Sequence, residues 1–246
     1  MSGHSKWATI KHKKGKTDAA RGKVFTKIGR ELAIAARDGG SDPENNSKLR
    51  DAIAKARANN MPNDSIQRAI KRASGEDNTA IFEEIVYEGY GTNGVAVIVE
   101  ALTDNRNRTA ADVRHLFDKY GAGLGTSGCV SWMFDKKGLM IVERTAESDE
   151  DALMMQALEA GAEDVKTEDD SFEILTDPGD FSAVREALEK QGLAFVTAER
   201  AMIPQNTIEL TDQDAVDKIN KLIDMLEDHD DVQNVYHNAD FPDEAE

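Results

Sequence analysis

The order of predicted strands and helices between residues 138 and 202 is the feature that most constrains the fold of this chain. Hydrophobic periodicity predicts strands at 138–143, 164–168, 172–176 and 195–202 and helices at 149–160 and 181–190. In sequence order these elements form a β-α-β-β-α-β set, which is the ferredoxin-like arrangement. We therefore expect residues 136–203 to form a complete ferredoxin-like domain.

The segments on either side of this domain form a second, incomplete unit. Its predicted elements are strands at 82–87, 94–102 and 129–134 and a helix that starts with the capping box at 109–112. One helix and one strand are missing from this unit, and segments 211–227 and 232–237 can supply them. We expect residues 79–135 and 204–246 to make one α/β domain, into which residues 136–203 are inserted.

Three short amphipathic helices are predicted before residue 76. The first runs from about Asp18 to the glycines at 39–40, the second starts at the cap signal of residues 42–44, and the third follows Pro62. They predict a small helical domain at residues 1–78. The expected fold class is therefore α+β, with an N-terminal three-helix bundle followed by two α/β sandwich-like domains, the last one ferredoxin-like and inserted in the other.

The sign of the charge reverses along the chain. Residues 1–75 hold 17 basic and 7 acidic side chains, whereas the remainder holds 13 basic and 40 acidic ones, for a net charge of −17 overall. A chain that separates its charges in this way usually presents its basic end to a polyanion. We expect DNA or ribosomal RNA to bind the N-terminal domain, while the acidic domains offer a docking surface for a protein partner.

The candidate nucleic-acid-binding residues begin in a basic arm, which we expect to become ordered on a partner. An indole next to lysines can stack on a base while the lysines contact phosphates. The candidates in the arm are Lys6, Trp7, Lys11, His12, Lys13, Lys14 and Lys16. Those on the predicted helices are Arg21, Lys23, Lys27, Arg30, Arg68, Lys71 and Arg72. A solubilising tail and ordinary solvated helix faces are the alternatives.

Arg106 and Arg108 lie in an Arg-Asn loop just before a predicted helix N-terminus, where backbone N–H groups also attract anions. One interpretation is a second contact to phosphate or RNA. The other is structural, with the polar residues capping the helix and the arginines pairing with nearby acids. The sequence leaves both open.

The sequence gives little sign of catalysis, so we predict no enzyme activity, no catalytic residue, no cofactor and no metal. The glycine-rich loop at 121–128 follows a helix and lacks the ending of a phosphate-binding loop. The five histidines have no metal-ligand spacing, and Cys129 is expected in an apolar strand. The acid run at 227–231 opposes the helix macrodipole, and only a partner or an ion would explain it.

The cellular location of the protein is predicted from sequence signals that the chain lacks. The chain has no stretch of about 18 apolar residues and no apolar signal region at its N-terminus, so we expect no membrane contact. A single cysteine suits a reducing compartment. These features favour a cytoplasmic protein.

Four stretches, SGHSKWATIKHKK, KVFTKIGREL, TDNRNRTAADVR and VSWMF, resemble the YebC family, which includes PmpR-type transcriptional regulators and mitochondrial translational activators. The resemblance runs over essentially the whole chain. It implies three domains, of which the first is helical. It also implies a cytoplasmic protein that either binds DNA as a regulator or assists ribosomes. Ala122 and Cys129 depart from the family's glycine-loop pattern, which weakens any ligand role for that loop.

The function predicted from these features is a DNA-binding transcriptional regulator. The alternative is a ribosome-associated, RNA-binding translation factor that promotes synthesis of particular proteins. Against DNA, the sequence offers no clear recognition helix that groups Arg with Asn or Gln. For RNA, the aromatic and basic arm and the Arg-Asn loop suit irregular single strands. The resemblance favours DNA.

Overall fold

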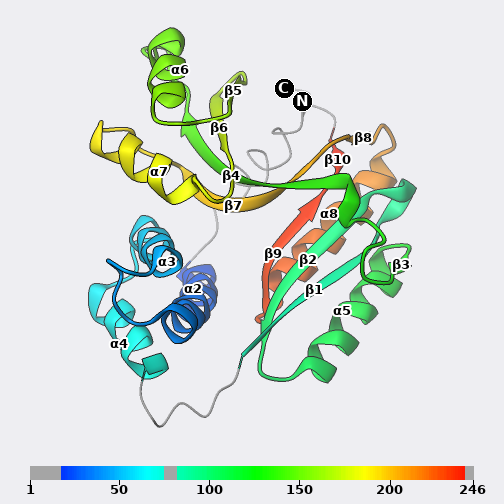
Figure 1. Ribbon diagram of the computed structural model, residues 1–246. Helices are drawn as coiled ribbons and strands as arrows, with labels where there is room; N and C mark the ends of the chain where they lie inside the picture. Colours follow the sequence, from blue (N-terminus) through cyan, green and yellow to red (C-terminus); the bar gives the residue numbers. More distant parts are fainter. Residues whose placement is uncertain (1–17, 75–81, 242–246) are drawn as a thin grey trace.

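The computed structural model describes residues 18–74 and 82–241 of the chain (Figure 1). Within this part, a helical bundle and one sheet lie side by side, and two long strands of a second sheet run across above them. None of the helices in these two ranges is long and apolar enough to cross a membrane.

The bundle consists of α2 (Asp18–Gly39), α3 (Ser47–Ala58) and α4 (Asn63–Ser74). Each helix buries one apolar stripe in a shared core, which includes Ile28, Leu32, Leu49, Ile53, Ile66 and Ile70. The predicted start of the second helix at residues 42–44 is wrong. Asn46 is the N-cap, because its side chain accepts from the Leu49 amide at 3.0 Å. Asp42 instead closes a turn by accepting from the Glu44 amide.

The first sheet, here called sheet A, has the strand order β3-β1-β2-β9 and antiparallel pairing throughout. Its strands are β1 (Glu83–Tyr90), β2 (Ala96–Thr103), β3 (Gly123–Leu124) and β9 (Val232–His237). Helices α5 (Arg106–Tyr120) and α8 (Gln213–Asp228) pack on one face of it. The C-terminal strand β9 therefore lies beside β2 in the sheet that begins with β1, and α8 packs on the same sheet.

The second sheet, sheet B, has the order β5-β6-β4-β7, which is the antiparallel ferredoxin-like order. Its elements are β4 (Phe134–Glu143), α6 (Glu150–Glu159), β5 (Asp164–Thr167), β6 (Ser171–Thr176), α7 (Phe181–Lys190) and β7 (Thr197–Pro204). A short parallel pair, β8 (Ile208–Glu209) with β10 (Ala239–Asp240), follows β7 and β9. The predicted fold class is confirmed, whereas the domain limits as folding units stay a prediction.

The strand predicted at 129–134 is wrong. Thr92–Gly94 and Ser131–Met133 are short 3₁₀ turns, η1 and η2, and β4 is one continuous strand from Phe134. The reason lies in Glu88 of β1, which is buried and accepts from three backbone N–H groups of this segment. The donors are Gly128 at 2.8 Å, Val130 at 2.9 Å and Ser131 at 2.8 Å. Their amides are thus directed at a carboxylate instead of a neighbouring strand.

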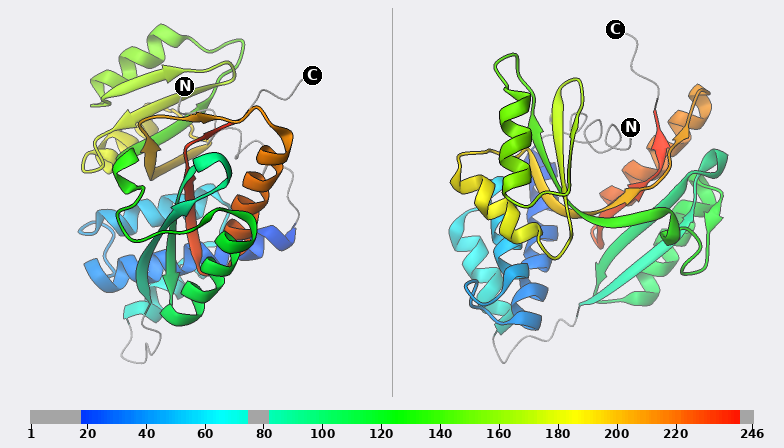
Figure 2. Two further views of the ribbon diagram at one scale, coloured as in Figure 1. Left: turned by 90° about the vertical axis from the view of Figure 1, so that its right-hand side faces the viewer. Right: turned by 45° about the horizontal axis from the view of Figure 1, so that its top comes forward.

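The two sheets share a core on the side of β2 that faces away from α5 and α8. Alternate β2 residues point to opposite faces, so Val97 and Val99 contact the helices while Ile98 packs toward sheet B. Leu139 of β4 and Tyr236 of β9 meet Ile98 in this shared core. Figure 2 shows the resulting arrangement from two other sides, with the long strands β4 and β7 linking both halves of the molecule.

Candidate nucleic-acid interface

Half of the candidate residues cannot be placed. Lys6, Trp7, Lys11, His12, Lys13, Lys14 and Lys16 lie outside the described residues, as does the side chain of Arg21. The remaining eight candidates lie on α2, α4 and α5, and their exposure and contacts differ between these three helices.

Helix α4 carries its three candidates on the solvent face. Arg68, Lys71 and Arg72 are all exposed, whereas Ile66 and Ile70 on the opposite side are buried. Arg68 makes local contacts, donating to the Asp64 carbonyl at 3.1 Å and to the Ser65 hydroxyl at 3.2 Å. The helix therefore presents a basic stripe that its own core packing leaves uncovered.

Two neutral residues that the sequence analysis passed over share this face of α4. Asn63 and Gln67 are exposed, and Asn63 precedes Gln67 by one turn as Gln67 precedes Lys71. A four-residue connection, 59–62, joins α3 to α4, with Asn60 in the left-handed region at φ 58°. The helical spacing of the buried residues Ile66 and Ile70 was the signal for this surface, because the polar residues between them must lie on the exposed side of α4.

The three candidates on helix α2 make contacts with another part of the protein. Lys23, Lys27 and Arg30 are spaced at i, i+4 and i+7, and all three reach the C-terminal end of α8. Lys23 Nζ lies 2.6 Å from the Asp228 carboxylate, and Lys27 Nζ lies 2.6 Å from the Glu227 carbonyl oxygen. In the acid run that the sequence left unexplained, the carboxylates of Asp228 and Asp231 thus have cationic partners on α2.

Asp231 is the buried centre of this contact, with 2 % of its surface exposed. Arg30 donates to one carboxylate oxygen at 2.9 Å, and Arg108 and Thr109 donate to the other at 2.9 and 2.7 Å. Burial by itself raises the pKa of Asp231, but the hydrogen bonds from Arg108 and Thr109 and the two guanidinium charges outweigh it. Together they lower that pKa from 3.8 to about 2.

The two arginines of α5 separate into different roles. The helix begins at Arg106 with Asn105 as its N-cap, so the predicted capping box at 109–112 is wrong and Thr109 is instead buried against Asp231. Arg108 pairs with Asp104 at 3.0 Å as well as with Asp231, which is the structural interpretation. Arg106 is exposed in the first turn of α5.

The glycine-rich loop is occupied by the protein itself. Backbone N–H groups at its end could attract an anion, but the Glu88 carboxylate already accepts from Gly128 of the loop and from Val130 and Ser131, which follow it. Burial raises the pKa of Glu88, and the three backbone hydrogen bonds outweigh this effect and lower the pKa. Burial and the nearby Glu88 charge raise the pKa of the Cys129 thiol, which disfavours the reactive thiolate.

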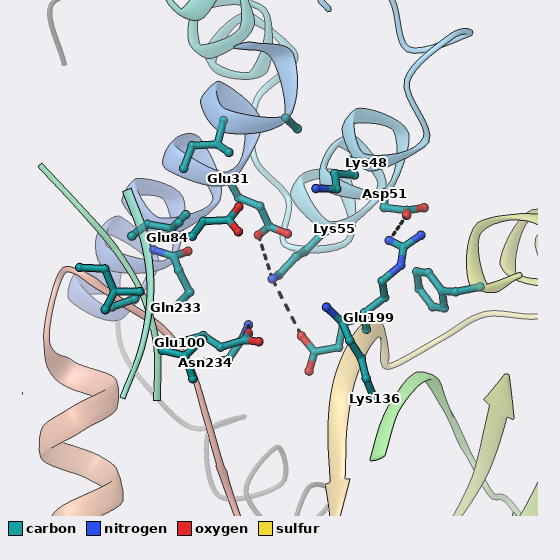
Figure 3. Close-up of a pocket in the computed structure, with 18 of the residues that line it drawn as sticks. Glu31, Lys48, Asp51, Lys55, Glu84, Glu100, Lys136, Glu199, Gln233 and Asn234 are labelled. Carbon is teal, nitrogen blue, oxygen red and sulfur yellow. Dashed lines mark hydrogen bonds and ion pairs between the residues drawn. The ribbon is translucent and has the colours of Figure 1, made fainter. Parts of the chain in front are cut away.

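A cavity of about 260 Å³ lies where the bundle meets both sheets (Figure 3). Lys55 of α3 projects into it, 2.9 Å from Glu31 of α2 and 3.9 Å from Glu199 of β7. Burial lowers the pKa of Lys55, but the charges of Glu31 and Glu199 outweigh burial and raise that pKa, so the lysine is charged. Glu100 of β2 accepts from Asn234 and Tyr236. The cavity is thus a polar junction that ties the parts together.

Within residues 18–74 and 82–241, no group of three or more His, Cys, Asp and Glu side chains could hold a metal ion. The acidic clusters of sheet B are therefore not assembled into a cation site in this part of the chain. The candidate interface is instead a set of cations, exposed on α4 and internally paired on α2.

A basic three-helix bundle joined to two acidic, sheet-based parts defines a three-part α+β protein. Residues 5–76 match the family described as TACO1/YebC protein N-terminal domain, and residues 82–239 match TACO1/YebC second and third domain. The chain belongs to the TACO1/YebC family.

Solved and curated relatives agree with this assignment. A protein of Acetivibrio thermocellus is 65% identical over 97% of this chain and 98% of its own length, and one of Clostridium novyi is 63% identical over 100% of both. Both are named probable transcriptional regulatory proteins. The crystal structure of the conserved hypothetical protein Aq1575 from Aquifex aeolicus is similar with a TM-score of 0.85 and 46% identity, covering 93% of this chain and 94% of that one.

Proposed function

We propose that this protein is a cytoplasmic, DNA-binding transcriptional regulator, not an enzyme, and that α4 reads the DNA. The observation that carries the proposal is the exposed face of α4 with Asn63, Gln67, Arg68, Lys71 and Arg72. Asn and Gln pair with adenine in the major groove, Arg and Lys pair with guanine, and both cations also contact phosphates. The names of the relatives support a regulatory role.

The placement of α4 supports the same function. A short turn joins α3 to α4, and α2 packs against both, which is how helix-turn-helix proteins support a recognition helix. The N-terminal part of such a helix contacts base edges, and here that part carries Asn63 and Gln67. In the sequence alone these two residues looked like ordinary surface, so a recognition helix was not evident.

Duplex-DNA binding at several salt concentrations tests the proposal. If about six basic residues contact phosphates, affinity falls roughly 10³-fold between 50 and 200 mM salt. The triple variant R68A/K71A/R72A should flatten the slope of log affinity against log salt by about three units. A matched control, K190A/K218A/K221A, removes three exposed cations from α7 and α8 and should leave the slope unchanged. An equal slope for wild type and the α4 variant would refute the role of α4.

Base reading is tested separately from phosphate contact. After selection of a preferred duplex from a random pool, Gln67→Ala should reduce discrimination at one base pair by about 1–3 kcal/mol while leaving the salt slope unchanged. Unaltered selection by both Gln67→Ala and Asn63→Ala would remove the support for direct readout by α4.

The second candidate function is a ribosome-associated translation factor. The observation that favours it is Arg106, which is exposed at the N-terminus of α5, far along the chain from the basic bundle. Backbone N–H groups and a guanidinium at one helix end suit an RNA phosphate. Co-sedimentation with ribosomes and binding to duplex DNA, measured on the same variants, separate the two functions.

A further inference from the structure

Acidic residues lie at the C-terminal end of α8, where negative charge is least favourable for a helix. Glu227 and Asp228 occupy the last turn, and Asp230 and Asp231 follow the C-cap residue His229. The last carbonyl groups of any helix are unpaired and carry partial negative charge, so acids there add to an existing repulsion. Cations near this end offset the repulsion, and Lys23 and Arg30 of α2 provide them together with Arg108 of α5.

The contact matches cations to oxygens along the length of α2. Lys23 Nζ donates to the Asp228 carbonyl at 3.3 Å in addition to its carboxylate, and Arg30 Nη1 donates to the Asp230 carbonyl at 2.5 Å. With the Lys27 bond to the Glu227 carbonyl, three successive cations meet a row of main-chain and carboxylate oxygens. A phosphate backbone offers the same chemistry, namely closely spaced anionic oxygens.

We propose that the acidic end of α8, residues 227–231, is an internal ligand that occupies the basic stripe Lys23, Lys27 and Arg30 and competes with nucleic acid for it. The proposal rests on the proposed nucleic-acid binding by the bundle and adds its regulation. In this structure the α4 residues Arg68, Lys71 and Arg72 are exposed to solvent, whereas the α2 stripe is occupied by the end of α8. A polyanion that engages both must first displace the end of α8.

The acid segment is held in place without α2. Asp231 is anchored on the other side by Arg108 of α5 and by Thr103 and Thr109, at distances of 2.9, 3.2 and 2.7 Å. Sheet A and α5 therefore keep the segment ready to bind α2 again. This arrangement makes the contact reversible, because residues 227–231 keep their conformation when α2 moves away.

The strength of the contact suits displacement. The Lys23–Asp228 pair is largely exposed, with 45% and 66% of the two side chains accessible, and such pairs are weak and screened by salt. Arg37 adds one hydrogen bond from Nη1 to the Phe82 carbonyl at 3.1 Å, and Arg30 lies over the Phe82 ring. At the inner end of the contact the side chains of Arg30 and Asp231 are only 19% and 4% accessible, and Arg30 also donates to the Leu102 carbonyl at 3.4 Å. Displacement therefore requires α2 to move away from sheet A as a unit.

Zero-length carbodiimide coupling tests the competition on the full chain. The reagent joins an amine to a carboxylate in direct contact, and Lys23 Nζ lies 2.6 Å from Asp228. Lys137 and Glu163 of sheet B form an internal control, because their atoms also lie 2.6 Å apart at a partly exposed site. Saturating duplex DNA should reduce the Lys23–Asp228 cross-link about fivefold or more and leave the Lys137–Glu163 cross-link unchanged.

The same sample is assayed for bound DNA, so that two failures can be told apart. Bound DNA with an undiminished Lys23–Asp228 cross-link would overturn the competition and leave the proposed function standing. A protein that binds neither duplex DNA nor RNA at low salt would overturn the proposed function instead, and the competition with it.

Charge removal from the competitor gives a second measurement. D228N/D230N should bind DNA about threefold or more tightly than wild type, since the Lys23–Asp228 pair is lost and the negative charge of Asp230 next to it is removed. The control D214N/D217N removes two exposed acids from the N-terminal half of the same helix and accounts for the general change in charge. Equal affinities for the two double variants would overturn the proposal.

Discussion

Asp51 of α3 and Arg200 of β7 are joined by a hydrogen bond of 2.5 Å between Asp51 Oδ2 and Arg200 Nη1, although 149 positions separate them. Ser182 of α7 donates to the same carboxylate oxygen at 2.7 Å, and Arg185 lies 3.5 Å from the other oxygen. This cluster fixes the bundle to sheet B, on a different side from the contact between α2 and α8. The bundle is therefore held at two separate places.

Removing the Asp51 carboxylate should weaken the first of these attachments. Asp51→Ala leaves Arg200 and the buried Arg185 without their shared acceptor, so we expect the free energy of unfolding to fall by about 1–3 kcal/mol. Urea unfolding of the full chain measures the change. Asp64→Ala, at an exposed position of α4, is the control and should alter stability by less than about 0.5 kcal/mol. Equal losses for the two variants would argue against the cluster.

The low pKa of Asp231 predicts how stability depends on pH. Because the folded-state pKa is about 2 and the ordinary value is 3.8, the carboxylate contributes stability above pH 4 and loses it as pH falls toward 2. Asp231→Asn should therefore lower the free energy of unfolding by about 2 kcal/mol at pH 7 and by much less near pH 2. Asp230→Asn is the exposed control. A deficit of constant size from pH 7 to pH 2 would contradict the assignment.

Glu88 should determine the shape of the glycine-rich loop. In Glu88→Gln the side chain keeps one acceptor oxygen for three backbone donors, so at least one of these amides loses its partner at a cost of about 1–3 kcal/mol. Amide hydrogen exchange at Gly128, Val130 and Ser131 should accelerate in this variant. Glu84→Gln, on the same strand but exposed, should leave exchange in the loop as it is.

The architecture was predictable because it depends on local periodicity. The alternation in β2 and the β-α-β-β-α-β order identified both sheet units, and the shortage of one helix and one strand indicated that α8 and β9 return to sheet A. The helix starts at Ser47 and Arg106 were missed by three to five residues. Asp42 and Thr109 suggested the caps of these two helices, whereas the side chains of Asn46 and Asn105 form them.

The candidate site was only partly predictable, because pairing between distant residues has no local signal. Lys23 and Asp228 are 205 positions apart. The sequence indicated Lys23 as a candidate for nucleic-acid binding and Asp228 as part of the acid run, but nothing connected the two. The acid run was recognised as needing a partner, but the partner could not be named. Likewise, Arg108 differs from Arg106 because it pairs with the buried Asp231. The spacing of residues in the sequence does not show which side chains become buried where two elements meet.

Arg106 and Arg108 should therefore behave differently when they are changed singly. Arg108→Ala removes one partner of the buried Asp231 and should destabilise the fold by about 1–3 kcal/mol, whatever the protein binds. Arg106→Ala should leave the unfolding midpoint unchanged. If ribosomal RNA is the target, Arg106→Ala should weaken ribosome co-sedimentation and leave duplex-DNA binding nearly untouched. A loss of stability in Arg106→Ala would exclude a surface role for this residue.

The inserted sheet should fold alone but at a cost in solubility. A fragment of residues 134–204 retains the core between sheet B and its helices, which includes Met140, Phe172, Ile174, Phe181 and Leu188. Its other face would expose Leu139, Ile141 and Ala201, which pack against Ile98 and Tyr236 in the full chain. We expect a cooperative thermal transition together with concentration-dependent association, since an uncovered apolar face favours self-contact. Calorimetry and sedimentation on the fragment check both expectations. Absence of a cooperative transition would mean that this core depends on sheet A, and that residues 136–203 are not an independent domain.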